Sequence, residues 1–280
     1  MTFGSLFAGI GGFDLGLERA GMECRWQVEI DPYASRVLEK HWPGVQRWPD
    51  VRTFPVGDPA GWHVDLICAG VPCQPISQAG KRKGKADERW MWGECLRVVA
   101  DLCPRFFVAE NPVNILNDDK GRTFAGLVRA IASVGYVCEW HVIRASDIGA
   151  KHRRARVWIV AYTDELRRQG RYASTPLQSV EQARDESAGS CESRRIRRQT
   201  VAPSTWFGNC LRREREAASG LSGLPGAARV HWAVEPDVGR VAHGLPSRVD
   251  RLRCLGNAVV PQVAEVIGRA IIQAESQVTT

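Results

Sequence analysis

The chain has 280 residues, of which 44% are hydrophobic and 25% charged. This composition is typical of a globular protein and excludes a disordered or collagen-like chain. The net charge of +7 comes mostly from arginine and indicates a nucleic-acid partner only weakly. Apolar runs such as Val64–Val71 are far shorter than the roughly 20 residues that cross a bilayer, so we expect no membrane span. Nine unpaired-looking cysteines and a start without a secretion signal favour a cytoplasmic protein with reduced thiols and no metal.

Strand-like and helix-like segments alternate along the first 160 residues. The run Val64–Ala69 is continuously apolar, as in a strand buried on both faces of a parallel sheet. Alternation of this kind predicts an open, doubly wound, mostly parallel α/β sheet of the Rossmann-like type. The other strands are expected at Thr2–Phe7, Cys24–Ile30, Arg105–Ala109, Val137–Arg144 and Arg156–Tyr162, and the helices at Phe13–Ala20, Pro32–His41, Glu88–Leu102 and Thr123–Val134.

The composition changes after Thr163. Up to about Val230 polar residues, arginine and glycine dominate, and no hydrophobic period is long enough to indicate a second core. Pro261–Ala274 then reads as an amphipathic helix that begins with proline. We therefore expect a catalytic and cofactor-binding domain over 1–162, a partly flexible recognition insert over 163–245, and a C-terminal segment over 246–280 whose helix packs back on the first domain.

A glycine-rich turn follows the first predicted strand and opens a helix. Its sequence is Phe7-Ala8-Gly9-Ile10-Gly11-Gly12, and glycines there let the backbone approach a ligand closely. The spacing differs from that of a dinucleotide site. Glu29 stands at the end of the second strand, where a ribose is held in sheets of this kind. Together these features indicate an adenosine-type cofactor, although a purely structural turn would look the same.

The loop Gly70-Val71-Pro72-Cys73-Gln74-Pro75 directly follows the strand Val64–Ala69. Ligands bind at this carboxyl edge in open α/β sheets. Prolines on both sides of Cys73 stiffen the loop, and a cysteine held there is a candidate nucleophile.

The next strand ends in Glu110, followed by a proline that we expect to stop it. A partly buried glutamate beside a ligand can carry a raised pKa and donate a proton. Arg154 and Arg156 precede the last strand, and side chains two residues apart in extended chain point to one side. The same arginine pair on a solvated face would have no function.

These motifs, in this order, resemble those of the cytosine-C5 DNA methyltransferases. The resemblance covers about 1–162 and 250–275, roughly two thirds of the chain. It rests on several short blocks: Phe7-Ala8-Gly9-x-Gly11-Gly12, Glu29-Ile30-Asp31, Asp50-Val51, Pro72-Cys73-Gln74, Glu110-Asn111, Arg154-x-Arg156 and Gly256-Asn257-Ala258-Val259-Val260-Pro261. Lys151-His152 stands where the family has Pro-Gln, and Pro112 where it has Val. A block after the variable region is hard to place; Glu235–Arg240 is the best candidate.

The resemblance implies methyl transfer from S-adenosylmethionine to C5 of a flipped-out cytosine through a covalent Cys73 adduct. It implies that Glu110 acts at N3, that Arg156 holds the base O2, and that Arg154 organises the pocket around Glu110 and Cys73. The cofactor residues would be Phe7 at adenine, Glu29 at the ribose and Asp50 at the exocyclic amine, with Asn257 and Ala258 closing the pocket beside Phe7 and Gly9. Further implied cofactor contacts are Ala8, Gly11, Gly12, Ile30, Val51 and Pro72.

Double-stranded DNA is the implied partner of a monomeric enzyme, and the sequence leaves open whether a restriction endonuclease accompanies it. Expected DNA contacts are Gln74, Ser77, Arg194, Arg195, Arg197 and Arg198. Two alternatives stay open: a tRNA cytosine-C5 methyltransferase, which shares the nucleophile loop, and a non-catalytic DNA-binding relative. The intact Cys73, Glu110 and arginine pair argue against the second.

Overall fold

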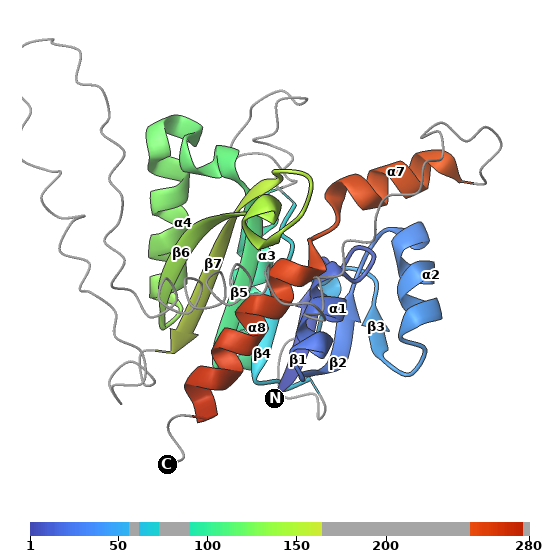
Figure 1. The fold of residues 1–280 in the computed structure, drawn as a ribbon. Coiled ribbons are helices and arrows are strands. Elements are labelled where there is room, and N and C mark those ends of the chain that lie inside the picture. Colours follow the sequence, from blue (N-terminus) through green and yellow to red (C-terminus); the bar gives the residue numbers. More distant parts are fainter. Residues whose placement is uncertain (56–61, 73–89, 164–246, 277–280) are drawn as a thin grey trace, which may run out of the picture.

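The computed structural model describes residues 1–55, 62–72, 90–163 and 247–276. These residues form a seven-stranded sheet in the order β3-β2-β1-β4-β5-β7-β6 (Figure 1). The strands are β1 Thr2–Leu6, β2 Glu23–Val28, β3 Gln46–Trp48, β4 Leu66–Ala69, β5 Phe106–Pro112, β6 Tyr136–Arg144 and β7 Ala155–Thr163.

The sheet is mostly parallel, which confirms the predicted fold class. Strands β1 to β5 pair in parallel, and only β7 runs against its neighbours β5 and β6. All four residues of β4 are buried, as a strand covered on both faces requires. The parallel pairing brings the carboxyl ends of β1, β2, β4 and β5 to one edge of the sheet.

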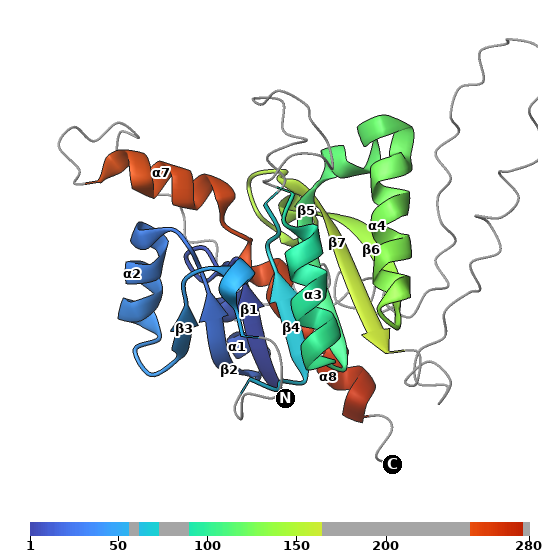
Figure 2. The same ribbon diagram turned by 180° about the vertical axis from the view of Figure 1, so that it is seen from behind.

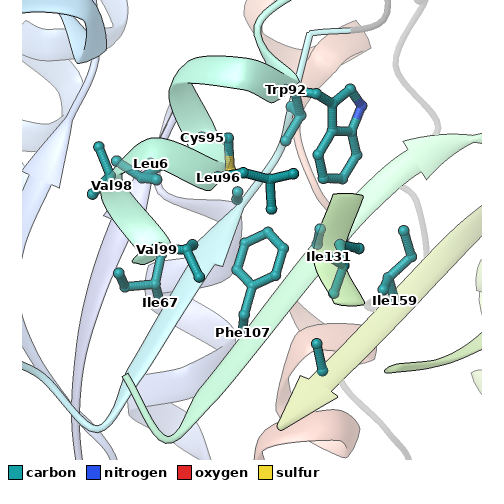
Figure 3. Packing of buried hydrophobic residues seen from close by; sticks show 14 of the residues in the cluster. Leu6, Ile67, Trp92, Cys95, Leu96, Val98, Val99, Phe107, Ile131 and Ile159 are labelled. Atoms are coloured by element: carbon teal, nitrogen blue, oxygen red, sulfur yellow. The ribbon is translucent and has the colours of Figure 1, made fainter. Parts of the chain in front are cut away.

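Helices cover both faces of the sheet (Figures 1 and 2). On one face α3 (Trp92–Leu102) and α4 (Arg122–Ser133) pack on the central strands, and Figure 3 shows Leu96 and Val99 of α3 against Phe107 of β5. On the other face lie α1 (Gly12–Arg19) and α8 (Pro261–Ser276). The second core therefore joins the two ends of the chain, with α8 packed against α1.

The predicted elements agree with the structure except at three places. Helix α2 spans Pro32–His41 as expected. Strand β3 and helix α7 (Arg248–Asn257) were not predicted, because β3 has three residues and α7 buries none. Strand β5 runs three residues past its predicted end at Ala109 and ends at Pro112, the proline expected to stop it, which pairs with Arg156 of β7.

The segment Arg248–Ser276 has the length and composition of a membrane span, but two features account for it otherwise. It consists of two helices, α7 and α8, that are separated at 258–260. Helix α8 buries seven residues, mostly at three- and four-residue intervals, against the core that contains α1: Val263, Ala264, Ile267, Gly268, Ala270, Ile271 and Ala274. A packed core helix thus explains the apolar composition.

Candidate active site

Glu29 lies just beyond the end of β2 and connects two loops of the carboxyl edge. One carboxylate oxygen accepts the Gly9 N–H at 2.7 Å, and the other accepts the Asp31 N–H at 2.7 Å. Burial raises the pKa of Glu29, while these backbone hydrogen bonds lower it. The carboxylate is therefore fixed by amides of both the glycine turn and the turn into α2.

The glycine turn has the open backbone that the sequence predicted. Gly9 has a φ of 58°, and a Cβ added there would meet no atom within 4 Å. Phe7 also has a left-handed φ, 53°, which is uncommon for a non-glycine residue. Ala8 donates its N–H to the Val28 carbonyl at 3.0 Å, so the turn is tied to the end of β2. Open space at Gly9 therefore lies next to Glu29.

Asp31, quoted above in the Glu29-Ile30-Asp31 block without a role, caps a helix at this edge. Its carboxylate accepts the N–H groups of Tyr33 and Ala34 at 2.9 and 3.0 Å and so caps the N-terminus of α2. The signal was present, since an aspartate directly before Pro32 is a common start of a helix. Ile30, between the two carboxylates, is 62% exposed and offers an apolar surface at the edge.

Asp50 follows β3 and already has a cationic partner. Its carboxylate accepts from Arg52 at 2.6 Å and caps a short 3-10 helix over Val51–Thr53. The hydrogen bonds from Arg52 lower the pKa of Asp50. Val51 is buried beneath this turn. An exocyclic amine that binds Asp50 would have to share the carboxylate with Arg52.

The C-terminal segment crosses the carboxyl edge between α7 and α8. A Cβ added to Gly12 would lie 2.4 Å from the Val259 carbonyl oxygen, so the segment lies directly against the start of α1. A Cβ on Gly70 would lie 3.5 Å from the Phe7 carbonyl oxygen and 3.6 Å from Val259 Cγ2. The turn after β1, the end of β4 and the C-terminal segment therefore meet at one point. Asn257 and Ala258 directly precede Val259 there.

Glu110, on β5, is 7% exposed and pairs with Arg156 of β7. Arg156 Nε lies 2.8 Å from Glu110 Oε1. Burial raises the pKa of Glu110 to about 7, although the charges of Arg156 and Arg154 act in the opposite direction. A carboxyl group with this pKa can exchange a proton at neutral pH.

The two arginines of the pair have different partners. Arg154 stands before β7 with a φ of 31° and donates to the carbonyls of Gly256 and Ala258 at 2.9 and 2.5 Å. The contact with Glu110 that the resemblance implied for Arg154 is thus made by Arg156. Spacing alone predicted one common side because it assumed extended backbone at Arg154, which its positive φ breaks.

Asn111 supports the loop that follows β4. It is fully buried, and its Nδ2 donates to the Val71 carbonyl at 3.0 Å and to the Glu110 carbonyl at 2.9 Å. Asn111 therefore links the residue before Pro72 to the residue that carries the buried carboxyl group. Sequence reasoning quoted Asn111 beside Glu110 without giving it a role.

Several predicted site residues lie outside the described part of the chain. These are the candidate nucleophile Cys73 and the expected DNA contacts Gln74, Ser77, Arg194, Arg195, Arg197 and Arg198. The insert 163–245 lies outside it too, apart from Thr163. Within residues 1–55, 62–72, 90–163 and 247–276, no cluster of three or more His, Cys, Asp or Glu side chains is arranged to hold a metal ion.

The chain is similar to known proteins in both sequence and structure. The family model for C-5 cytosine-specific DNA methylases matches residues 1–206. Among curated proteins, the type II methyltransferase M.NgoMIV of Neisseria gonorrhoeae is 37% identical over 171 residues, which are 59% of this chain and 53% of the relative. M.BsuFI of Bacillus subtilis is 35% identical over 167 residues, 59% of this chain and 40% of that protein. The match thus spans about half the length of these relatives.

Two solved structures share the fold. A candidate DNA modification methyltransferase encoded within an E. coli prophage has a TM-score of 0.50 at 26% identity, over 60% of this chain and 48% of that one. The Dnmt2 methyltransferase of S. pombe has a TM-score of 0.58 at 15% identity, over 100% of both chains. Since the family model covers most of the chain and the motifs meet at one edge of the expected sheet, the chain belongs to the C-5 cytosine-specific DNA methylase family.

Proposed function

We propose that the protein transfers a methyl group from S-adenosylmethionine to C5 of cytosine in double-stranded DNA. The observation that carries this proposal is the pairing of Glu110 with Arg156 at the same sheet edge as Glu29, in a chain of this family. Type II methyltransferases among the relatives support DNA as the substrate. We further propose a monomeric cytoplasmic enzyme without a metal, and make no assignment of a restriction endonuclease partner.

The part of the carboxyl edge that contains Gly9 and Glu29, here called the cofactor half, has the chemistry that an adenosine group needs. Glu29 is anchored by backbone amides and keeps acceptor capacity for ribose hydroxyls. Gly9 leaves open space beside it, and the exposed Ile30 gives an apolar surface for a purine ring. Phe7, Asp50, Asn257 and Ala258 complete the proposed site. When bound, S-adenosylmethionine supplies an electrophilic methyl group.

The part of the carboxyl edge that contains Glu110 and Arg156, here called the base half, would activate the cytosine. In this proposal the Cys73 thiolate adds to C6, which raises the electron density at C5, and protonated Glu110 donates a proton to N3. After C5 has gained the methyl group, loss of the C5 proton to water expels Cys73 as the thiolate, and N3 returns its proton to the Glu110 carboxylate. Arg156 orients Glu110 and binds the base O2, while Asn111 fixes the start of the loop through Val71.

Cytosine C5 and C6 cannot be reached inside a duplex, so the base must leave the helix, at a cost of a few kcal/mol. The insert, with Arg194, Arg195, Arg197 and Arg198, would bind phosphates, together with Gln74 and Ser77 near the pocket. We propose the catalytic core over 1–162, the recognition insert over 163–245 and the returning segment over 246–280.

A mechanism-based substrate tests the proposal directly. Bisulfite sequencing of DNA from expressing cells would first give the modified site. A duplex with 5-fluorocytosine at that site should then form an adduct that survives denaturing electrophoresis and requires S-adenosylmethionine. Fluorine cannot leave C5 as a cation, so Cys73 cannot be expelled and stays bonded to C6.

Peptide mapping identifies the nucleophile in the same experiment. The adduct should map to Cys73 and be absent in the Cys73→Ala variant. Cys68 and Cys95 serve as internal controls, because both are fully buried and burial raises the pKa of each thiol. An adduct at either control would move the active site, and methylation of tRNA without methylation of duplex DNA would replace the proposed substrate.

A further inference from the structure

Helix α7 is attached to the rest of the protein mainly through polar contacts. It buries no residue, and its apolar side chains Val249, Leu252 and Leu255 are exposed. In Figures 1 and 2 it extends from the start of α8 over α2. Hydrophobic burial therefore does not determine where the C-terminal end of α7 lies. The polar contacts at that end determine its position instead.

Arg154 makes two of these contacts. Its two terminal nitrogens donate to the carbonyls of Gly256 and Ala258, at the end of α7. The last carbonyls of a helix have no partner within the helix, and a cation is favourable at this end of the helix dipole. The guanidinium thus caps α7 and holds the chain directly before Val259.

A second contact ties α7 to the turn before α2. Arg253 lies 2.6 Å from the Asp31 carboxylate, which also caps α2 two residues after Glu29. Arg154 directly precedes β7, the strand that carries Arg156, whereas Asp31 belongs to the turn beside the proposed ribose site. The end of α7 therefore connects the base half of the edge with the cofactor half.

Arg154 acts on Glu110 through its charge, whereas its hydrogen bonds go to the C-terminal segment. Arg156 forms the ion pair with Glu110, and the positive φ of Arg154 directs its side chain to the C-terminal segment instead. Both of its terminal nitrogens are used there. These hydrogen bonds hold the chain at Asn257 and Ala258, the residues that would close the cofactor pocket.

We propose that Arg154 is a positioning residue for cofactor binding: it holds Gly256–Ala258 across the carboxyl edge, so that affinity for S-adenosylmethionine depends on a residue of the base half. This inference rests on the proposed function for the identity of the cofactor. It differs from the role that the sequence resemblance implied, in which Arg154 organises Glu110 and Cys73.

The test measures cofactor affinity and segment protection in the full chain. Calorimetry with S-adenosylmethionine should show roughly tenfold weaker binding or more for Arg154→Met, the range expected when charge-assisted hydrogen bonds are lost. Arg154→Lys should recover part of the affinity, because an ammonium group can reach one carbonyl. Hydrogen exchange of the amides at 255–260 should become faster in Arg154→Met and be slower again in Arg154→Lys.

Arg153→Met is the matched control, since it removes the same charge from an exposed neighbouring side chain. It should leave the affinity and the exchange rates unchanged. If Arg154→Met fails to fold, as a thermal melt would show, Arg154→Lys against wild type decides the question. The proposal is overturned if wild type binds S-adenosylmethionine but the Arg154 variants bind it equally well. Wild type that does not bind the cofactor would instead overturn the proposed function, while the exchange data still report whether Arg154 holds the segment.

Discussion

Two glutamates at one sheet edge have opposite kinds of partners. Glu29, beyond β2, accepts two backbone N–H groups at 2.7 Å each, whereas Glu110, on β5, faces the Arg156 guanidinium at 2.8 Å. Burial raises the pKa of both carboxyl groups. The partners of Glu29 belong to the backbone of two turns, while the partner of Glu110 is a side chain with rotatable bonds.

The difference indicates which carboxylate binds and which one transfers a proton. Backbone amides hold Glu29 in one position, which suits a group that must only accept hydrogen bonds from a ligand. Glu110 has a pKa of about 7, so neither of its protonation states is strongly preferred at neutral pH. A group of this kind can donate a proton in one step and be ionised in the next.

The largest expected effect tests the base half. Glu110→Gln should lower the rate of methyl transfer by about 10²–10⁴, because the amide cannot donate a proton as an acid does. Affinity for S-adenosylmethionine should hardly change. Single-turnover assays with labelled cofactor, combined with calorimetry, measure both quantities.

Glu139→Gln is the control for this experiment. Glu139 is 6% exposed on β6 and accepts a hydrogen bond from the Tyr162 hydroxyl at 3.2 Å, away from the carboxyl edge. The Glu139→Gln variant should transfer methyl groups at the wild-type rate. A rate within a few fold of wild type for Glu110→Gln would remove Glu110 from the mechanism and end the contrast with Glu29.

The cofactor half should respond in binding instead of rate. Glu29→Ala should weaken the binding of S-adenosylmethionine by about 1.5–3 kcal/mol, the contribution of a hydrogen bond to a charged group. Glu23→Ala, on the exposed start of the same strand, should bind normally. Calorimetry gives both affinities, and equal affinities would place the ribose elsewhere.

The sequence predicted this edge better than the contacts across it. Continuous apolar runs located β4 and β5, and the residues after them fixed where Glu110 would lie. The partner of Glu110 depends on the backbone turn at Arg154, which residue spacing cannot show. Helix α7 escaped prediction because it buries no side chain and so has no hydrophobic period.

A smaller effect concerns pH. The proton on Glu110 is present below its pKa of about 7, so the wild-type rate should fall relative to that of Glu110→Gln as pH rises above 7. The limit is tenfold per pH unit, because each unit removes nine tenths of the remaining protonated form. Taking the ratio of the two rates cancels the titration of Cys73, which both proteins share. A ratio that stays constant from pH 6 to 8 would show that Glu110 does not change its protonation state in this range.

The smallest effect concerns a third buried carboxylate, which has no cationic partner and is held mostly by side-chain donors. Asp14, fully buried in α1, accepts from Ser5 Oγ, Gln27 Nε2 and the Cys24 thiol at 3.1, 2.9 and 3.5 Å. Burial raises its pKa to about 6, above the ordinary value of 3.8, so the folded state keeps a proton that the unfolded chain has lost. The stability that this group contributes is present at low pH and is lost as pH rises through 6. Asparagine has the same shape as aspartate and does not titrate. The free energy of unfolding of Asp14→Asn, relative to that of wild type, should therefore be about 1 kcal/mol higher at pH 6 than at pH 5. Denaturant unfolding at the two pH values measures this gain. An unchanged difference would mean that Asp14 is already ionised at pH 5, held by its three donors as firmly as Glu29 is held by amides.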